Sequence, residues 1–404
     1  MTIASGTQSA QSTLGDNSLK NSGVFLSSAM ATIKTDALII GAGPSGLTLG
    51  ICLLKQGKSV LIADKHLAGL DFSRAILVNS NTLELLEPFG VNELLEKEAI
   101  AVNGFSFYAN GKLASRAKFD LSELGKHHPL CLPQLKTENC LLEVFTRLGG
   151  QLIRGLEFVA DAPNPDNKKH IVRLSPYKSN QQSIEVACDW LFGCDGYHSA
   201  VRKMLGINFP GHQIEENGYA VDALLGEWPF ETNLNVWLEK EGAGMAIEIA
   251  KNTVRIVGTT KAICDKVFSS LPVRSTSWNG SFNIRFQLAD SYGHDRVWLA
   301  GDAIHVHSPI GGRGMNMGIA DAISLADAIE HGSLKTYQEI RRPVARDWVA
   351  RNYLITKTIM RQDRLGQLLR ELICGCFLFL GKLMGKKLAA RIFRNLSTAK
   401  VAVL

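Results

Sequence analysis

The sequence lacks the paired cysteines of a metal or redox site. Its cysteines are scattered, and no two of them have the CxxC spacing: Cys52, Cys131, Cys140, Cys188, Cys194, Cys264, Cys374 and Cys376. A cysteine-based zinc site and a thioredoxin-like centre are therefore excluded. Scattered cysteines are typical of a reducing compartment, so we expect a cytoplasmic protein and no metal.

Net charge is also low over most of the chain. Basic residues exceed acidic residues by 6 over the 404 residues, but residues 361–404 alone contain nine basic and two acidic side chains. The rest of the chain is close to neutral and lacks the basic surface that a nucleic-acid partner requires. The length, with 46% apolar residues, is sufficient for two packed domains.

The first 34 residues are rich in Ser, Thr, Asn, Gln and Gly and have no apolar periodicity. We therefore predict a disordered extension over residues 1–34. The apolar stretch Val24–Ala31 follows no basic segment and is short for a secretory signal of ~7 to 15 apolar residues, so secretion is not expected. Met30 precedes the first predicted strand, which leaves open whether residues 1–29 belong to the native protein.

A glycine-rich turn then lies between a predicted strand and a predicted helix. Residues 36–40 and 59–63 have the pattern of short buried strands, and residues 47–56 have helical spacing. The turn reads Gly41-Ala-Gly-Pro-Ser-Gly46, a GxGxxG motif, and Asp64 follows the second strand. Such glycines allow a tight turn, close approach of a pyrophosphate and close helix packing, while the acid accepts hydrogen bonds from a ribose. The unit predicts a dinucleotide site, without distinguishing FAD from NAD, that contains Gly41, Gly43, Ser45, Gly46, Asp64 and Lys65.

Two later segments each end an apolar strand in a turn. Residues 191–194 lead to Asp195-Gly196, and residues 296–300 lead to Gly301-Asp302. The loop Ser308-Pro-Ile-Gly-Gly-Arg-Gly-Met-Asn316 and a helical run follow. With its ordered GxGxxG, DG and GD motifs, the sequence resembles the class A FAD-dependent aromatic hydroxylases, the monooxygenases with the para-hydroxybenzoate hydroxylase fold, over about residues 35–355.

The resemblance implies a set of flavin contacts. Asp302 would bind ribityl hydroxyls, and the helix that begins in the glycine loop would direct its positive end at the flavin pyrimidine ring. An N-cap role for Asp302 and ordinary surface roles for Arg74 and Gln134 stay open as alternatives. The cofactor-binding residues implied in this way are Arg74, Gln134, Asp302, Gly312, Gly314, Met315 and Asn316.

The same loop supplies the catalytic candidates. The resemblance implies that Pro309 lines the isoalloxazine ring, and His307 could bind substrate or relay a proton near neutral pH, with a packed side chain as the alternative. Many relatives have glutamine where this chain has Arg313, so the pocket beside the flavin would gain a positive charge. Asp195 could organise FAD and the nicotinamide nucleotide, with Arg202 as a phosphate partner, or it could cap the next turn.

These features predict an α/β fold with a Rossmann-like FAD-binding domain (35–100, 131–204 and 293–355), a mixed-sheet substrate domain (101–130 and 205–292) and a C-terminal helical basic tail (356–404). The resemblance implies that NADH or NADPH reduces FAD and that one oxygen atom from O2 enters an aromatic or lipophilic, electron-rich small molecule. A reductase of the same fold acting on a prenyl or polyene chain, and a flavin-binding protein without turnover, are the alternatives. The substrate, the choice of nucleotide and the oligomeric state stay open.

The C-terminal segment combines apolar and basic residues. The apolar run Leu372–Leu380 is too short to cross a bilayer, which takes about 20 residues. Residues 365–400 could instead form an amphipathic helix that contacts a membrane surface, which would make the protein membrane-associated. The alternative is that their apolar face packs on the FAD domain.

Overall fold

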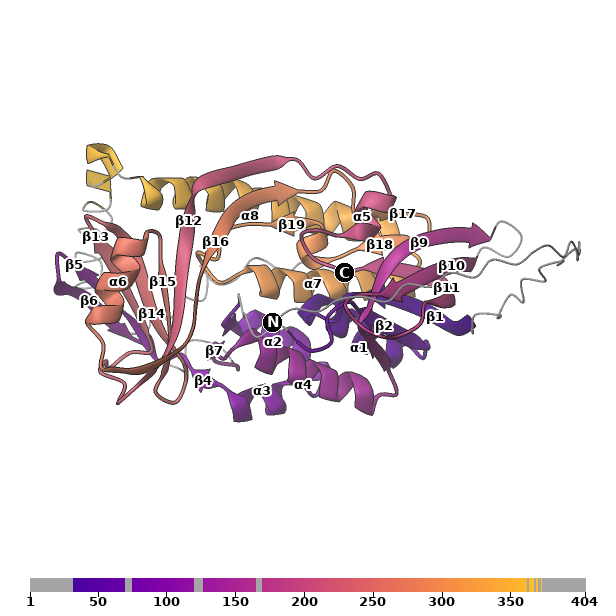
Figure 1. The fold of residues 1–404 in the computed structure, drawn as a ribbon, viewed down its shortest axis with the longest axis horizontal. Helices are drawn as coiled ribbons and strands as arrows, with labels where there is room; N and C mark the ends of the chain where they lie inside the picture. Colours follow the sequence, from indigo (N-terminus) through magenta and orange to yellow (C-terminus); the bar gives the residue numbers. More distant parts are fainter. Residues whose placement is uncertain are drawn as a thin grey trace, which may run out of the picture.

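The computed structural model describes residues 32–69, 75–119, 126–164, 169–361, 363–366, 368, 369 and 372. The predicted extension up to residue 31, the candidate Arg74 and residues 373–404 of the predicted tail lie outside the described residues. Figure 1 shows a mainly parallel sheet with its helices at one end, a second sheet at the other end, and the long helix α8 (Leu334–Met360) running along both. This arrangement confirms the predicted α/β fold.

The first sheet has the parallel order of a dinucleotide-binding fold. Its central order is β8-β2-β1-β11-β18, and every neighbouring pair in it is parallel. These strands are β1 (Thr32–Ile40), β2 (Val60–Asp64), β8 (Gln151–Arg154), β11 (Ile184–Gly193) and β18 (Val297–Leu299). Antiparallel additions are β17 (Gly293–His294) on β18, and the hairpin β9 (Leu156–Asn164) and β10 (Lys169–Pro176) on β11.

Strand β1 begins inside the segment that we predicted to be disordered. Residues 32–34 pair with residues 185–187 of β11. Thr32 and Lys34 are exposed, so this end of the strand has no apolar pattern. The sequence periodicity could not reveal the strand because its partner, and not a buried face, holds it in place.

Helix α1 (Pro44–Lys55) connects β1 to β2 and packs against α4 (Gln134–Arg147) and α7 (Gly314–Glu330). Residues 46–53 of α1 are all buried. A Cβ at Gly50 would lie 2.7 Å from the Phe145 ring, so α1 and α4 approach closely only because this residue is glycine.

The sequence of residues 80–100 predicts a helix, and in the structure this segment is interrupted. It consists of α2 (Ser80–Leu86), a 3-10 turn (Glu87–Phe89) and α3 (Asn92–Glu98). Pro88 has no backbone N–H to donate, and Gly90 adopts a φ of 70° that ends the turn. The remaining short helix of the first domain is α5 (Ala200–Met204), which follows β11.

The second sheet is mixed and has the order β19-β16-β12-β15-β14-β13-β5-β6. Its strands are β5 (Gly104–Ala109), β6 (Lys112–Lys118), β12 (Gly211–Leu225), β13 (Leu234–Glu239), β14 (Gly242–Ala250), β15 (Thr253–Gly258), β16 (Val273–Leu288) and β19 (His305–Val306). Helix α6 (Lys261–Ser269) covers one face, and the opposite face is turned toward the first domain (Figure 1). A small sheet of β3 (Leu77–Val78), β7 (Leu130–Cys131) and β4 (Ile100–Ala101) lies against β14.

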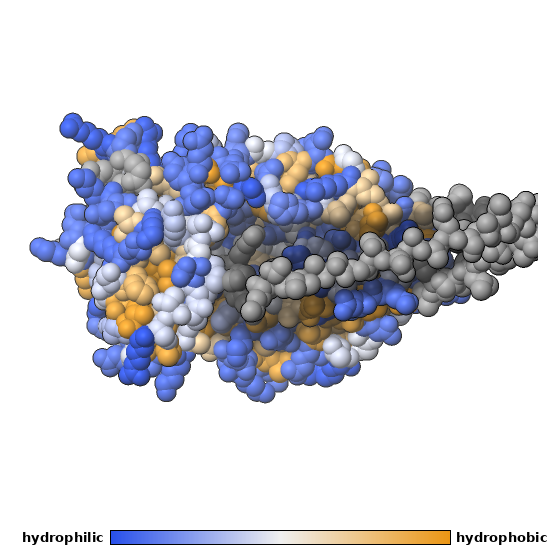
Figure 2. All heavy atoms as spheres, in the orientation of Figure 1, coloured by the Kyte–Doolittle hydropathy of each residue, from blue (hydrophilic) through white to orange (hydrophobic). Residues whose placement is uncertain are grey.

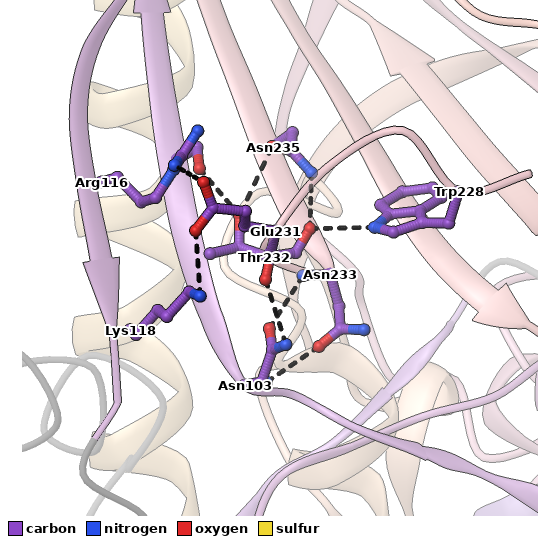
Figure 3. A network of polar contacts seen from close by, with 9 residues as sticks. Asn103, Arg116, Lys118, Trp228, Glu231, Thr232, Asn233 and Asn235 are labelled. Carbon is purple, nitrogen blue, oxygen red and sulfur yellow. Dashed lines mark hydrogen bonds and ion pairs between the residues drawn. The ribbon is translucent and has the colours of Figure 1, made fainter.

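A polar network fastens the β5–β6 hairpin to the rest of the second sheet (Figure 3). Glu231 forms ion pairs with Arg116 and Lys118 of β6. The side-chain oxygens of Asn103 and Asn233 each accept the backbone N–H of the other residue, at 3.0 and 2.9 Å. The network is completed by Trp228, Thr232 and Asn235. The end of the sheet formed by β5 and β6 is therefore held by side chains as well as by backbone pairing.

The surface seen in Figure 2 is mostly hydrophilic, with apolar patches at the end where the second sheet lies and over the part that holds the first sheet. None of the helices in the described part of the chain combines the length and the apolar character that a bilayer crossing requires.

The six cysteines within the described residues are all free thiols, and five of them are buried. Burial raises the pKa of Cys140 and Cys264 to about 11 and that of Cys188 to about 12. These thiols are therefore protonated at neutral pH and unsuited to nucleophilic chemistry.

A buried charge network joins β19, α7 and α8. The Asp321 carboxylate accepts hydrogen bonds from His305 Nε2 at 2.6 Å and from Arg341 Nε at 2.8 Å. Burial alone would raise the pKa of Asp321, but Arg341 and His305 together hold it below its ordinary value. The Asp321 carboxylate is therefore charged, and both Arg341 and His305 stabilise this charged form.

Replacing Arg341 tests this network. We expect Arg341→Met to lower the free energy of unfolding by about 3–5 kcal/mol, because it leaves a charged carboxylate buried without its guanidinium. Urea denaturation near neutral pH measures the change. The matched control is Arg346→Met on the same helix, whose exposed pair with Asp347 should contribute only ~0–1 kcal/mol. A similar small loss for both variants would contradict the prediction.

Candidate active site

Four parallel strands of the first sheet end at the same edge, and a residue that the sequence singled out lies at or just after the end of each. Gly41 follows β1, Asp64 ends β2, Asp195 follows β11 and Asp302 follows β18. Ligands of such sheets bind beyond the carboxyl ends of the strands. The fold thus brings together motifs that are up to 261 positions apart in the sequence.

The three glycines of the first turn differ in what an added side chain would meet. Gly41 has a φ of 107°, and a Cβ there would lie 2.3 Å from the carbonyl oxygen of Cys194. A Cβ at Gly46 would lie 2.0 Å from the carbonyl oxygen of Gly41. At Gly43, by contrast, no atom of the described residues lies within 4 Å of an added Cβ. Gly41 and Gly46 therefore serve packing, and Gly43 leaves open space.

The space at Gly43 suits a pyrophosphate. Helix α1 begins there, with Gly43 as the N-cap residue and a proline in its first turn. No side chain caps the first amides, and the first turn holds no acidic residue. The free N–H groups and the positive end of the helix dipole are thus available to an anionic ligand. The turn fits the diphosphate of FAD.

Asp64 is held beside this turn. Its two carboxylate oxygens accept the backbone N–H groups of Ala42 at 2.7 Å and of His66 at 2.8 Å. Each oxygen keeps a lone pair that could accept a ribose hydroxyl. Lys65 directs its amine toward Tyr177, 5.5 Å from the ring centroid, and so lies at the same end of the strand.

Ser45 lies where two distant segments meet α1. A Cβ on Gly301 or on Gly318 would lie 2.4 or 2.3 Å from Ser45 Oγ. The serine side chain therefore fills the space that these glycines leave, and a cofactor contact of Ser45 stays a prediction. Asp302 is exposed and lies between the buried residues Gly301 and Ala303 in a 3-10 turn (Gly301–Ala303).

The glycine loop before α7 is anchored by α8. Asn352 accepts the backbone N–H of Ser308 at 3.0 Å and donates to the carbonyl of Ile310 at 2.8 Å. Thr356 Oγ1 lies 3.0 Å from Ser308 Oγ. Pro309, in this anchored stretch, is exposed, and its place against the flavin ring stays a prediction.

Asn316 ties the first turn of α7 to the strand β3 region. Its Nδ2 donates to the carbonyls of Leu77 and Gly312, and its Oδ1 accepts the backbone N–H of Asn79. The side chain is thus engaged with the protein, which leaves the predicted contact to the backbone of this turn. The N–H groups at Gly314 and Met315 belong to the same open first turn.

His307 is held in one neutral form. Its Nδ1 lies 2.8 Å from the carbonyl oxygen of Ser308, so Nδ1 carries the proton and Nε2 is an acceptor. Burial lowers the pKa of His307 to about 4. This argues against a proton relay near neutral pH and leaves two roles open, a substrate contact and a packed side chain.

Arg313 carries a positive charge at the start of α7. Its guanidinium carbon lies 3.8 Å from the centroid of the Trp348 ring, and the His307 ring meets the same tryptophan edge-on at 5.9 Å. The charge therefore lies between the glycine loop and α8, and its predicted place in the pocket beside the flavin stays a prediction.

The Asp195 turn leads into α5, whose N-cap residue is Ser199. Asp195 accepts the backbone N–H of Ala200 at 2.6 Å, which agrees with the predicted capping role, and its part in cofactor binding stays a prediction. Arg202 is buried and donates to the carbonyls of Ala303 and Tyr197, both at 2.8 Å. The predicted phosphate contact of Arg202 is not supported, because protein carbonyls already occupy its guanidinium.

Gln134 begins α4 and links it to the segment after the undescribed Arg74. Its Oε1 accepts the backbone N–H of Ala75 at 3.2 Å, and its Nε2 donates to Glu138 at 2.8 Å. Burial raises the pKa of Glu138. The predicted flavin contact of Gln134 stays a prediction.

Sequence reasoning missed the α8 residues that hold the loop. Trp348, Asn352 and Thr356 are spaced four apart and therefore share one helix face. A tryptophan followed by Asn and Thr at one-turn intervals was the available signal, but this pattern is not a recognisable motif.

Comparison with known proteins agrees with this geometry. The sequence profile of the FAD binding domain family matches residues 34–263 and 258–352. The chain is 29% identical to a 12-dehydrotetracycline 5-monooxygenase/anhydrotetracycline 6-monooxygenase of Streptomyces rimosus, over 84% of this chain and 73% of that protein. It is 30% identical to a rifampicin monooxygenase of Rhodococcus hoagii, over 78% and 69%. The crystal structure of p-nitrophenol 4-monooxygenase from Pseudomonas putida superposes with a TM-score of 0.77 at 21% identity, over 91% of this chain and 99% of that one.

The fold, the open dinucleotide turn and the family match together define an FAD-binding oxidoreductase. The chain belongs to the FAD binding domain family, within the class A flavin-dependent aromatic monooxygenases, as the sequence motifs predicted.

The contrast between Gly43 and Gly46 gives a matched test. We expect Gly43→Ala to fold normally, because its φ of −76° suits alanine and the added methyl meets no atom in the described part of the chain. We expect the variant to bind FAD at least about 10-fold more weakly. We expect Gly46→Ala to lower the stability of the apoprotein by about 1–3 kcal/mol, because its methyl meets backbone. Flavin titration and urea denaturation of the apoproteins measure the two effects. Wild-type flavin affinity in Gly43→Ala would refute the assignment.

Proposed function

We propose that the protein hydroxylates a multi-ring aromatic compound of the anhydrotetracycline or rifampicin kind, at the expense of NADH or NADPH and O2. The open space at Gly43 is the observation that supports the flavin site, and the relatives named above support the class of substrate. The finer choice among such compounds depends on the second sheet.

The residues at the strand ends would hold FAD, which supplies hydride acceptance and reaction with O2 when bound. Gly43 and the first turn of α1 receive the diphosphate, Asp64 the adenosine ribose, and Asp302 the ribityl chain. The open first turn of α7 receives the pyrimidine edge. No side-chain nucleophile is required, so the protein acts by positioning the reactants and excluding water.

Basic side chains beside the Asp195 turn form our proposed contact for the reducing nucleotide. Partial burial, and then the charges of Lys203, Arg285 and Lys65, lower the pKa of His198. The Arg285 guanidinium stacks on Tyr197 at 4.4 Å. Cationic groups gathered in this way suit the phosphates of NADH or NADPH.

The face of the second sheet opposite α6 provides an apolar wall for the substrate. Met245 pairs directly with Val236 and Val257, so these three side chains share that face. All three are only partly buried, although the face is turned toward the first domain. The Asp222–Arg255 ion pair on the same face adds a polar point for substrate oxygens.

Labelled dioxygen tests the reaction class. We expect the product of a substrate that stimulates NAD(P)H oxidation to gain one oxygen atom, and to gain it from O2 and not from water. Mass spectrometry of the product measures the label. Unchanged turnover without O2 would favour the reductase alternative. If none of a panel of phenols, quinone precursors and polyketides stimulates NAD(P)H oxidation, the result would favour a flavin-binding protein without turnover.

We also propose that residues 365–400 contact an anionic membrane surface. Leu365, Leu368 and Leu372 are exposed, by 49%, 61% and 67%, and their spacing places them on one helix face. The sequence beyond them continues with apolar residues and with lysines and arginines. An amphipathic helix of this composition binds through apolar burial and attraction to anionic headgroups.

Vesicle sedimentation tests the membrane contact. We expect the full-length protein to sediment with anionic vesicles at low salt, and less at high salt, because salt screens the headgroup attraction. A truncation ending at Gly366 should stay in the supernatant, as should the full-length protein mixed with neutral vesicles. Equal, negligible sedimentation of the full-length protein and the truncation would remove the proposal.

A further inference from the structure

Helix α7 begins with an unusual residue. Its N-cap is Arg313, which makes no capping hydrogen bond, and its first turn contains no acidic side chain. Asn, Asp, Ser or Thr is the usual choice, because an oxygen there satisfies the free N–H groups. A cation next to the positive end of a helix dipole is unfavourable unless an anion balances both.

Contacts fix the guanidinium in place. Only 8% of Arg313 is exposed, and its guanidinium carbon lies 3.8 Å from the Trp348 ring centroid. Stacking of this kind is worth more in a desolvated site than at the surface. Burial lowers the pKa of Arg313 to about 10, with a smaller contribution from Arg351, so the group is still cationic at neutral pH.

The partner of this stack is itself anchored to the glycine loop. Trp348 lies one turn before Asn352, which hydrogen-bonds Ser308 and Ile310. A Cβ on Gly311 would lie 3.2 Å from the Trp348 ring, so the loop touches the tryptophan directly. The charge therefore has a fixed place relative to the first turn of α7.

We propose that Arg313, positioned by Trp348, strengthens the positive potential at the start of α7 and thereby stabilises the anionic reduced form of the bound flavin. Arg313 acts through its charge, and Trp348 is a positioning residue. This inference rests on the flavin site of the proposed function, but it concerns the flavin's reduction equilibrium and needs no substrate. A buried charge is little screened by solvent and so acts on a neighbouring anion at short range.

The test is the midpoint potential of the bound flavin in the holoenzyme, with the dissociation constant of sulfite as a second readout. Sulfite adds to oxidised flavin to give an anion, so it responds to the same potential. We expect Arg313→Gln to weaken sulfite binding about 10-fold and to lower the reduced-to-oxidised ratio by a similar factor, which is about 30 mV for a two-electron couple. Arg313→Lys keeps the charge and should stay within about 3-fold of the wild type in both measurements.

Two further variants separate charge from structure. Trp348→Phe keeps an aromatic face and should behave as wild type, whereas Trp348→Leu should shift both readouts in the direction of Arg313→Gln. Arg351→Gln removes an exposed charge from α8, the helix of Trp348. Its effect on the potential and on sulfite binding should be smaller and should vanish at high salt, while that of Arg313→Gln persists.

Flavin content is measured first, so that each variant is compared as holoenzyme. Equal potentials in Arg313→Gln and wild type would overturn the proposal, as would an equal shift in Arg313→Lys and Arg313→Gln. A failure to hydroxylate any substrate would count against the proposed function but would leave these measurements intact.

Discussion

The structure depends on the contact between the first turn of α1 and two segments far away in the sequence. Gly41 and Gly46 leave no room for a side chain against backbone, and Ser45 occupies the space left by Gly301 and Gly318. Because these contacts join β1, the turn after β18 and α7, the dinucleotide turn is complete only when the long-range sheet has formed. Local sequence creates the turn, and tertiary packing gives it its final shape.

The site also depends on a helix that carries no motif. The glycine loop before α7 is held by Asn352 and Thr356 of α8, and the charge of Arg313 is held by Trp348. The flavin loop is therefore positioned from outside, by a helix that also packs on the second sheet. A change along α8 can reach the flavin loop without touching any ligand.

The sequence predicted what is local and periodic. The strand, turn and helix around Gly43, with Asp64 at the next strand end, follow from spacing alone, and the ordered motifs predicted the family. Pro88 and Gly90 were a signal for the break between α2 and α3, but the helical pattern on both sides of them led to the prediction of one continuous helix. The carbonyl partners of Arg202 and the anchors on α8 could not be predicted, because they depend on which distant backbone a side chain meets.

The buried cysteines have a consequence for the durability of the catalyst. A flavin monooxygenase that reduces O2 without transferring oxygen to a substrate releases hydrogen peroxide inside its own site. Peroxide oxidises thiolates, and sulfenic acids form only where a cysteine is ionised and accessible. All six cysteines of the described chain have a pKa raised by desolvation, and five of them are buried. The protein therefore offers its own by-product no reactive thiol among these six, and wasted turnovers leave this part of the core chemically intact.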